Sequence, residues 1–126
     1  MKIKTDFTTN SSSSSFVIAV KSGATIKEIE DGISEKELTS FIDEYGEYIY
    51  EFNDELSKDA STEDKVKFAK HTLAKTFLNM VKGGMEIGDW KVAAMEGSSE
   101  DGDLAGNFLY GGFDVDSPIL RTKAFD

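Results

Sequence analysis

Residues 61–84 read STEDKVKFAKHTLAKTFLNMVKGG, and this stretch decides the fold because it predicts one long helix. Ser61 has the side chain of a helix N-cap, and acidic residues follow it in the first turn, where the helix dipole favours them. The glycine pair at 83–84 predicts the end of the helix. Apolar residues recur inside it at spacings of three and four over a wide face. A helix of this kind is predicted to be buried on more than one side.

Another helix is predicted upstream, from Ser34 to about Lys58. The run SEKE at 34–37 has the form of a capping box, and apolar residues follow at spacings of three and four. Gly46 is the weak point, because glycine lowers helix stability by about 1 kcal/mol relative to alanine. The YIY run at 48–50 also has strand propensity. We nevertheless predict one helix here, antiparallel to the 61–84 helix because the connection between them is short.

Extended segments flank the two helices. Residues 1–7 alternate between polar and apolar types, and residues 16–20 read FVIAV, which is typical of a buried strand. Residues 24–33 fit either a short helix or a strand. We predict a single α+β domain over residues 1–126, with an antiparallel sheet of four or five strands packed in two layers against two antiparallel helices. Its C-terminal strands form a meander from the short runs at 89–95, 107–110 and 118–124.

Charge and composition exclude several classes of function. The net charge is −10, and residues 28–64 hold fourteen Asp and Glu against two Lys, whereas residues 65–82 hold five Lys and no acid. With one Arg in the chain, direct binding to nucleic acid or to an anionic membrane is not expected. No run approaches the roughly 20 apolar residues of a membrane span, and we expect a cytoplasmic protein. The absence of cysteine excludes disulfides, thiolate metal sites and thiol catalysis.

Few residues are candidates for catalysis or metal binding. His71 is the single histidine, and it is interpreted as a surface or boundary residue because no partner for acid–base chemistry accompanies it in the sequence. Residues 100–107 resemble the start of a calcium loop, but the ligand pattern fails at the fifth and twelfth positions, so a hairpin turn is favoured. We expect no cofactor. The weak candidates for a metal site are Asp101, Asp103, Asp114 and Asp116.

Two surfaces are candidates for binding another protein. One is the acidic face of the 34–58 helix, and the other is the aromatic-rich stretch at 108–113. We predict a non-enzymatic interaction module that uses one or both of them. The candidate residues are Glu44, Glu47, Glu51, Asp54, Glu55, Phe108, Tyr110 and Phe113.

Two alternatives stay open. The carboxylates could imitate nucleic-acid phosphates, which requires them to lie on one continuous face. The chain could instead be a divalent-metal-dependent enzyme, which requires its four candidate aspartates to meet in one cleft. The partner, the biological process and the oligomeric state do not follow from the sequence.

The run TDFTTNSSSSSF at 5–16 is the most unusual segment. Five serines lie between two predicted strands, too near the N-terminus to link domains, so we predict that the tract is ordered. It should extend the strand that begins at Phe16, with Ser13 and Ser15 on the same side of the sheet as Val17 and with alternate hydroxyls buried. The segment resembles an N-terminal signature of small proteins of unknown function from Gram-positive bacteria and their phages, and this resemblance implies a bacterial or phage source.

Overall fold

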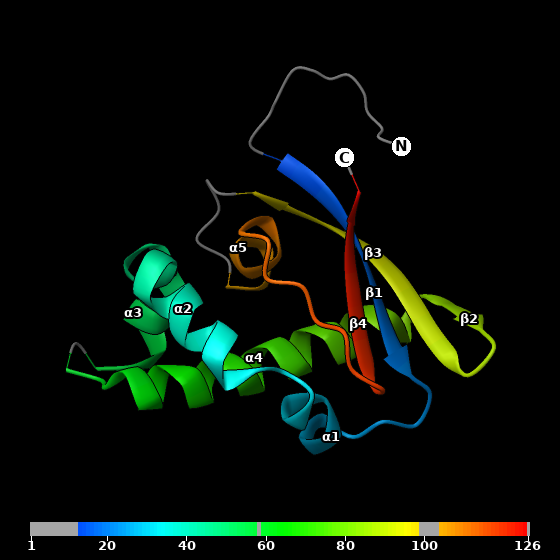
Figure 1. Cartoon of the computed structure of the whole chain (residues 1–126), viewed down its shortest axis with the longest axis horizontal. Coiled ribbons are helices and arrows are strands. Elements are labelled where there is room, and N and C mark those ends of the chain that lie inside the picture. The colour runs from blue at the N-terminus through cyan, green and yellow to red at the C-terminus, as the bar shows by residue number, and fades with distance from the viewer. Residues whose placement is uncertain (1–12, 58, 99–103, 126) are drawn as a thin grey trace.

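A computed structural model describes residues 13–57, 59–98 and 104–125 of the chain (Figure 1). It has a four-stranded antiparallel sheet and, within those residues, five α-helices, so the predicted α+β class is confirmed. In chain order the elements are β1 (Ser13–Lys21), α1 (Ile26–Asp31), α2 (Glu35–Tyr45), the 3₁₀ helix η1 (Gly46–Tyr48), α3 (Tyr50–Glu55), α4 (Thr62–Lys82), β2 (Met85–Ile87), β3 (Trp90–Ser98), α5 (Leu104–Tyr110) and β4 (Leu120–Phe125).

The sheet has the strand order β2-β3-β1-β4, and every neighbouring pair is antiparallel. Along the central strand β1, Phe16 and Ile18 are buried, whereas Val17 and Ala19 are partly exposed. One face of the sheet therefore packs on the core, and the opposite face does not. Because β1 separates β3 from β4, these C-terminal strands do not form the predicted meander.

The helix α4 packs both against the N-terminal helices and against the sheet. It contacts α1 and α2, and it also contacts β1 and β3, which α5 contacts as well (Figure 1). Its buried Leu73 and Phe77 join Phe16 and Ile18 of β1 in one hydrophobic cluster. The helices on the core face of the sheet are thus α4 and α5, while α2 packs on α4. The predicted pair of long helices covering the sheet is not confirmed.

The 61–84 helix was predicted correctly. The α4 helix spans Thr62–Lys82, the Ser61 hydroxyl accepts a hydrogen bond from the Asp64 amide at 3.1 Å, and Gly83 follows the last turn. Residues 24–33, which fit either a short helix or a strand in the sequence, contain the short helix α1. Its N-terminus carries a full capping box, in which Thr25 and Glu28 exchange side-chain hydrogen bonds with each other's backbone amides.

The prediction of one continuous helix from Ser34 to about Lys58 was wrong. The helix α2 does begin after Ser34, whose hydroxyl accepts a hydrogen bond from the Glu37 amide, but it ends at Tyr45. A 3₁₀ turn and the extended residue Ile49 separate it from α3. Weak helix propensity at Gly46 and the strand preference of the YIY run explain the break.

The predicted strand at 107–110 is also wrong, because these residues belong to the helix α5. All residues from Leu104 to Leu109 are buried, Asn107 among them. A helix enclosed on every side has no polar face, so its sequence lacks the 3.6-residue alternation that identifies surface helices. The runs at 89–95 and 118–124 do contain strands, β3 and β4.

The last three residues of the serine tract belong to a strand. The strand β1 begins at Ser13, three residues before Phe16, so the tract does extend the strand. Ser15 lies on the same face as Val17, as predicted, but its side chain is exposed and not buried. The predicted strand at 1–7 and the first two serines of the tract lie outside the described residues.

Candidate functional site

Five exposed carboxylates gather where the chain breaks between α2 and α3. They come from three consecutive elements and share their surface with two exposed aromatic side chains, Tyr48 and Tyr50, whose exposed fractions are 64% and 50%. We call this surface the acidic corner. It consists of Asp43 and Glu44 of α2, Glu47 and Tyr48 of η1, and Tyr50, Asp54 and Glu55 of α3.

The helix break builds the acidic corner. Ile49 has an extended backbone and a fully buried side chain, so the chain is anchored in the core at that residue. The neighbouring residues Tyr48, which ends η1, and Tyr50, which begins α3, are both exposed. Gly46 is buried in the turn, where an added Cβ would come within 3.3 Å of the Ile42 side chain. A continuous helix would not expose both tyrosines beside the carboxylates.

The carboxylates of the acidic corner are not the partners of the ion pairs found among the described residues. The polar contacts of α4 with the neighbouring helices involve acids from the other end of the acidic block. They are the ion pair of Lys70 with Glu35 and the contact of His71 with Glu30, each at 2.8 Å. Within the described residues, no ion pair includes a carboxylate of the acidic corner. Like charges held together at a surface produce a negative potential that favours a positively charged partner.

A hollow of about 290 Å³ adjoins the acidic corner between the η1–α3 segment and the start of α4. Its wall is mixed, with apolar groups beside one carboxylate, one amide, one hydroxyl and one ammonium. It is large enough to take a side chain of a bound partner. The lining residues are Gly46, Glu47, Phe52, Asn53, Leu56, Ser57 and Lys65.

Glu51, which the sequence placed with the binding carboxylates, has a structural role. It is only partly exposed, and its Oε1 accepts a hydrogen bond of 2.6 Å from the backbone amide of Leu104. Leu104 is the first residue of α5, where a backbone N–H has no partner within the helix. A carboxylate at this position satisfies the amide and interacts favourably with the helix dipole. Glu51 therefore joins α3 to α5.

The aromatic stretch at 108–113 is largely part of the core. Phe108 is fully buried, and its ring lies 5.4 Å from that of Phe41 and 5.5 Å from that of Phe113. Tyr110 and Phe113 are partly buried and pack against the same core. The predicted aromatic binding surface is therefore corrected: Phe108 is not on the surface, and its neighbours are half covered.

Tyr45 lies where this aromatic cluster meets the acidic corner. Its ring centroid is 5.6 Å from that of Phe41 and 6.3 Å from that of Phe113. Burial raises the pKa of the Tyr45 hydroxyl above its usual value of 10.0, and the charge of Glu44 adds to this effect. The hydroxyl consequently stays protonated near neutral pH and does not act as a base.

The candidate metal ligands are only partly covered by the structure. Asp101 and Asp103 lie outside the described residues. Asp114 and Asp116 are exposed, with Asp114 Oδ1 accepting a hydrogen bond of 3.5 Å from the Thr122 hydroxyl and Asp116 pairing with Arg121 at 3.3 Å. Among the residues that the structure describes, no three His, Asp or Glu side chains are grouped as a metal site requires.

Comparison with protein-family models, curated proteins and solved structures finds no match to this chain. In the described residues, no helix has the length and apolar character needed to cross a membrane. His71 is exposed on α4, and its contact with Glu30 joins α4 to α1.

Sequence reasoning missed two features of the surface. It treated Tyr48 and Tyr50 as members of one continuous helix, although Gly46 and the strand preference of the YIY run at 48–50 signal a break there. It also missed that the sheet face opposite the core carries Trp90, Met85 and Ile87. The alternation of apolar residues on both sides of β1 could have indicated this.

Replacing Lys70 with Gln is expected to make the fold less stable at pH 7 and to have a smaller effect at pH 3. The Lys70 ammonium donates a hydrogen bond to Glu35, which lowers the pKa of that carboxyl below its ordinary value of 4.5. A lowered pKa in the folded state stabilises the fold above the ordinary value, and this contribution is lost as the pH falls through the folded-state pKa. The measurement is the urea midpoint of both proteins at the two pH values.

The matched control for this experiment is Lys75→Gln, at an exposed lysine on the same helix. It should change the urea midpoint by the same small amount at both pH values. A Lys70→Gln difference that does not depend on pH would contradict the role of the Glu35 pair.

Proposed function

We propose that this protein is a non-enzymatic module that binds a basic segment of another protein at the acidic corner. The observation that carries the proposal is the combination of five exposed carboxylates, unpaired with any described cation, and the two exposed tyrosines beside them. Carboxylates steer and orient a positively charged partner, while tyrosine supplies contact area with little loss of side-chain entropy. The adjoining hollow would receive one side chain of the partner.

The helix break supports this proposal over imitation of nucleic acid. Phosphates follow one another regularly along a backbone, and a long uninterrupted helix could space carboxylates in a similar row. Here the helix ends at Tyr45, and the following carboxylates belong to η1 and to the separate helix α3. Glu51, in the middle of the predicted row, is already used to hold Leu104. The remaining carboxylates form a compact group that suits a short peptide.

The proposal is tested with a photo-crosslinking amino acid at position 48 of the full chain. Because residues 5–16 resemble a signature of bacterial and phage proteins, we propose a bacterial cell as the source of the partner. Irradiation should give a discrete adduct with one partner protein. Mass spectrometry should then show that the crosslinked peptide of the partner is rich in Lys and Arg. The double variant Glu44→Gln/Glu47→Gln should lower the adduct yield at least fivefold, since about 1 kcal/mol per charge is lost at close contact.

Two controls make this experiment specific. The double variant Asp31→Asn/Glu86→Gln removes the same number of charges from exposed sites elsewhere and should leave the yield unchanged. The crosslinker at Asn79, exposed on α4, should not give the same adduct. An adduct that forms equally well in both double variants, or no discrete adduct from position 48, would overturn the proposal.

A further inference from the structure

The two edges of the sheet are covered unequally. At the β4 edge the preceding segment of the chain covers the strand, because the Thr122 amide donates a hydrogen bond of 2.9 Å to the Val115 carbonyl. At the opposite edge, β2 pairs with residues 90–92 of β3 only. Within the described residues, no strand continues beside residues 93–98 of β3, and we call this stretch the β3 edge.

Every second residue of the β3 edge directs its backbone groups away from β1. Hydrogen-bonded and non-bonded pairs alternate along an antiparallel ladder. The Ser22 amide donates a hydrogen bond of 2.8 Å to the Asp89 carbonyl, one step beyond the first pair of the β1–β3 ladder. The odd-numbered residues of β3 therefore bond to β1. The even-numbered ones, Ala94 and Glu96 among them, present their amides and carbonyls on the side where β2 lies, as a template for one more strand.

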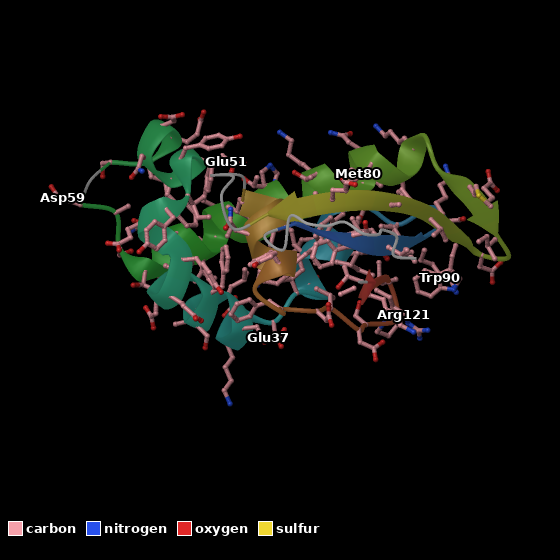
Figure 2. All side chains as sticks on the ribbon, turned by 90° about the horizontal axis from the view of Figure 1, so that it is seen from above. Glu37, Glu51, Asp59, Met80, Trp90 and Arg121 are labelled. Carbon is pink, nitrogen blue, oxygen red and sulfur yellow. The ribbon has the colours of Figure 1, made fainter. Side chains whose placement is uncertain are left out.

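Apolar side chains flank the β3 edge on the core face of the sheet. Ala93 and Met95 lie there, directly opposite Ile18 and Phe16 of β1, but they are only partly buried. Met80 of α4 is partly buried as well, and in the view of Figure 2 it lies on the side of β3 away from β1. Since α4 contacts β3, one more strand in line with β2 would cover these side chains further.

The segment that precedes β1 is close enough to reach the β3 edge. β1 begins at Ser13, directly opposite Ser98 at the end of β3. Passing from β1 around the end of β3 to its far side takes two strand spacings, or about 10 Å. Residues 7–12 can span about 20 Å when extended, so they are long enough for this connection. A short tether also gives the segment a high effective concentration, which a separate molecule would have to exceed.

The sequence of residues 2–6, KIKTD, fits the β3 edge. Lys2 and Lys4 alternate with the apolar Ile3, as in a strand with one buried face. With Ile3 on the core face, both lysines are on the opposite face, where the exposed Glu96 lies. The chain as a whole has a net charge of −10, so a segment with two ammonium groups and one carboxylate is attracted to the rest of it.

We infer that residues 2–6 bind the β3 edge as a fifth strand of the sheet, parallel to β3 and in line with β2. The direction follows from the connection, because a segment that joins β1 around the end of β3 runs the same way as β3. The strand closes an edge that would otherwise be open to pairing with other chains. This inference is independent of the function proposed for the acidic corner.

Charge and length select one register for this strand. A shift by one residue would turn Ile3 to the exposed face. With Lys4 beside Glu96, Ile3 is beside Met95 on the core face. A shift by two residues in one direction would bring the carboxylates of Asp6 and Glu96 together. A shift by two in the other direction would leave less of the segment beside β3.

Amide hydrogen exchange and nuclear Overhauser contacts of the full chain test this inference. The amides of Ala94 and Glu96 face the proposed strand, whereas those of Ala93 and Met95 bond to β1 and are internal controls. All four should exchange at least about tenfold more slowly than an unstructured amide. Overhauser contacts should join residues 3–4 to residues 95–96, and they should persist unchanged on dilution.

A charge exchange in the full chain gives a second readout. Lys4→Glu and Glu96→Lys should each speed the exchange of the Ala94 amide about fivefold, because each brings two like charges together. The double variant Lys4→Glu/Glu96→Lys should return the rate to within about twofold of the original, because opposite charges meet again. Lys36→Glu makes the same change in charge at an exposed position of α2 and should leave the rate unchanged.

Three results would overturn the inference. Fast exchange at Ala94 and Glu96 beside slow exchange at Ala93 and Met95 would show that the β3 edge is free. Protection that appears only as the protein concentration rises would assign the edge to a second copy of the chain. A double variant that exchanges as fast as the single variants would show that Lys4 is not beside Glu96.

Discussion

Replacing Phe108 with alanine is expected to lower the free energy of unfolding by about 4 kcal/mol. The Phe108 side chain is fully buried, and its edge-to-face contact with Phe41 and stacked contact with Phe113 would both be lost. The cavity cannot be filled easily, because β1, β3 and α4 hold α5 in place from several sides. The measurement is the guanidinium-induced unfolding midpoint and slope, followed by circular dichroism.

The control for this experiment is Tyr48→Ala, at a side chain that is 64% exposed. It should change the free energy of unfolding by less than about 0.5 kcal/mol. The pair also separates the core role of Phe108 in the structure from the binding role predicted for it from the sequence. If Phe108→Ala left stability intact, the placement of Phe108 in the core would be wrong and a surface role would return.

Local patterns predicted the elements whose stability is decided locally. The α4 helix has an N-cap serine, acids in its first turn and a glycine after its last turn, and all three signals lie within the segment itself. The strand β1 was likewise identified from its β-branched residues. Where such signals agree, the fold can be predicted from a short window of sequence.

Elements decided by distant contacts could not be predicted in this way. The helix α5 begins where Glu51, 53 residues earlier in the chain, accepts the hydrogen bond of the Leu104 amide. Its apolar residues then pack on Phe41 of α2 and on the sheet. No window around residues 104–110 contains this information, and the short run at 107–110, bounded by glycines, was predicted as a strand.

The candidate site was predicted in its chemistry but not in its geometry. Clustering of acidic residues at 43–55 followed from the sequence, and four of the five predicted carboxylates are at the surface. The exception is Glu51, which the sequence does not distinguish from the other carboxylates but which accepts a hydrogen bond from the distant Leu104 amide. The exposure of Tyr48 and Tyr50 could not be predicted without the break near Gly46. The helix ends there because glycine has a weak helix propensity and the YIY run has a strand preference.

Replacing Gly84 with alanine is expected to lower the free energy of unfolding by about 3 kcal/mol, which is at the upper end for an overpacked site. Gly84 lies between α4 and β2, where the chain passes close to β3. A Cβ built on it would overlap the carbonyl oxygen of Val92 and lie 2.8 Å from the carbonyl carbon. These are backbone atoms of a paired strand, so they cannot move aside as a flexible side chain would. Relief would require β2 to separate from β3.

The neighbouring Gly83 is a matched control, because it occupies the same connection with no atom within 4 Å of an added Cβ. Its φ of −94° is open to any residue, so Gly83→Ala should be neutral or stabilising by about 0.5 kcal/mol, through a less flexible unfolded chain. Thermal and urea unfolding of both variants measures the difference. The β2 strand, Met85–Ile87, follows Gly84 directly, so Gly84→Ala should also disturb the amide signals of these residues. Equal stability of the two variants would show that the approach of Gly84 to Val92 does not constrain the fold.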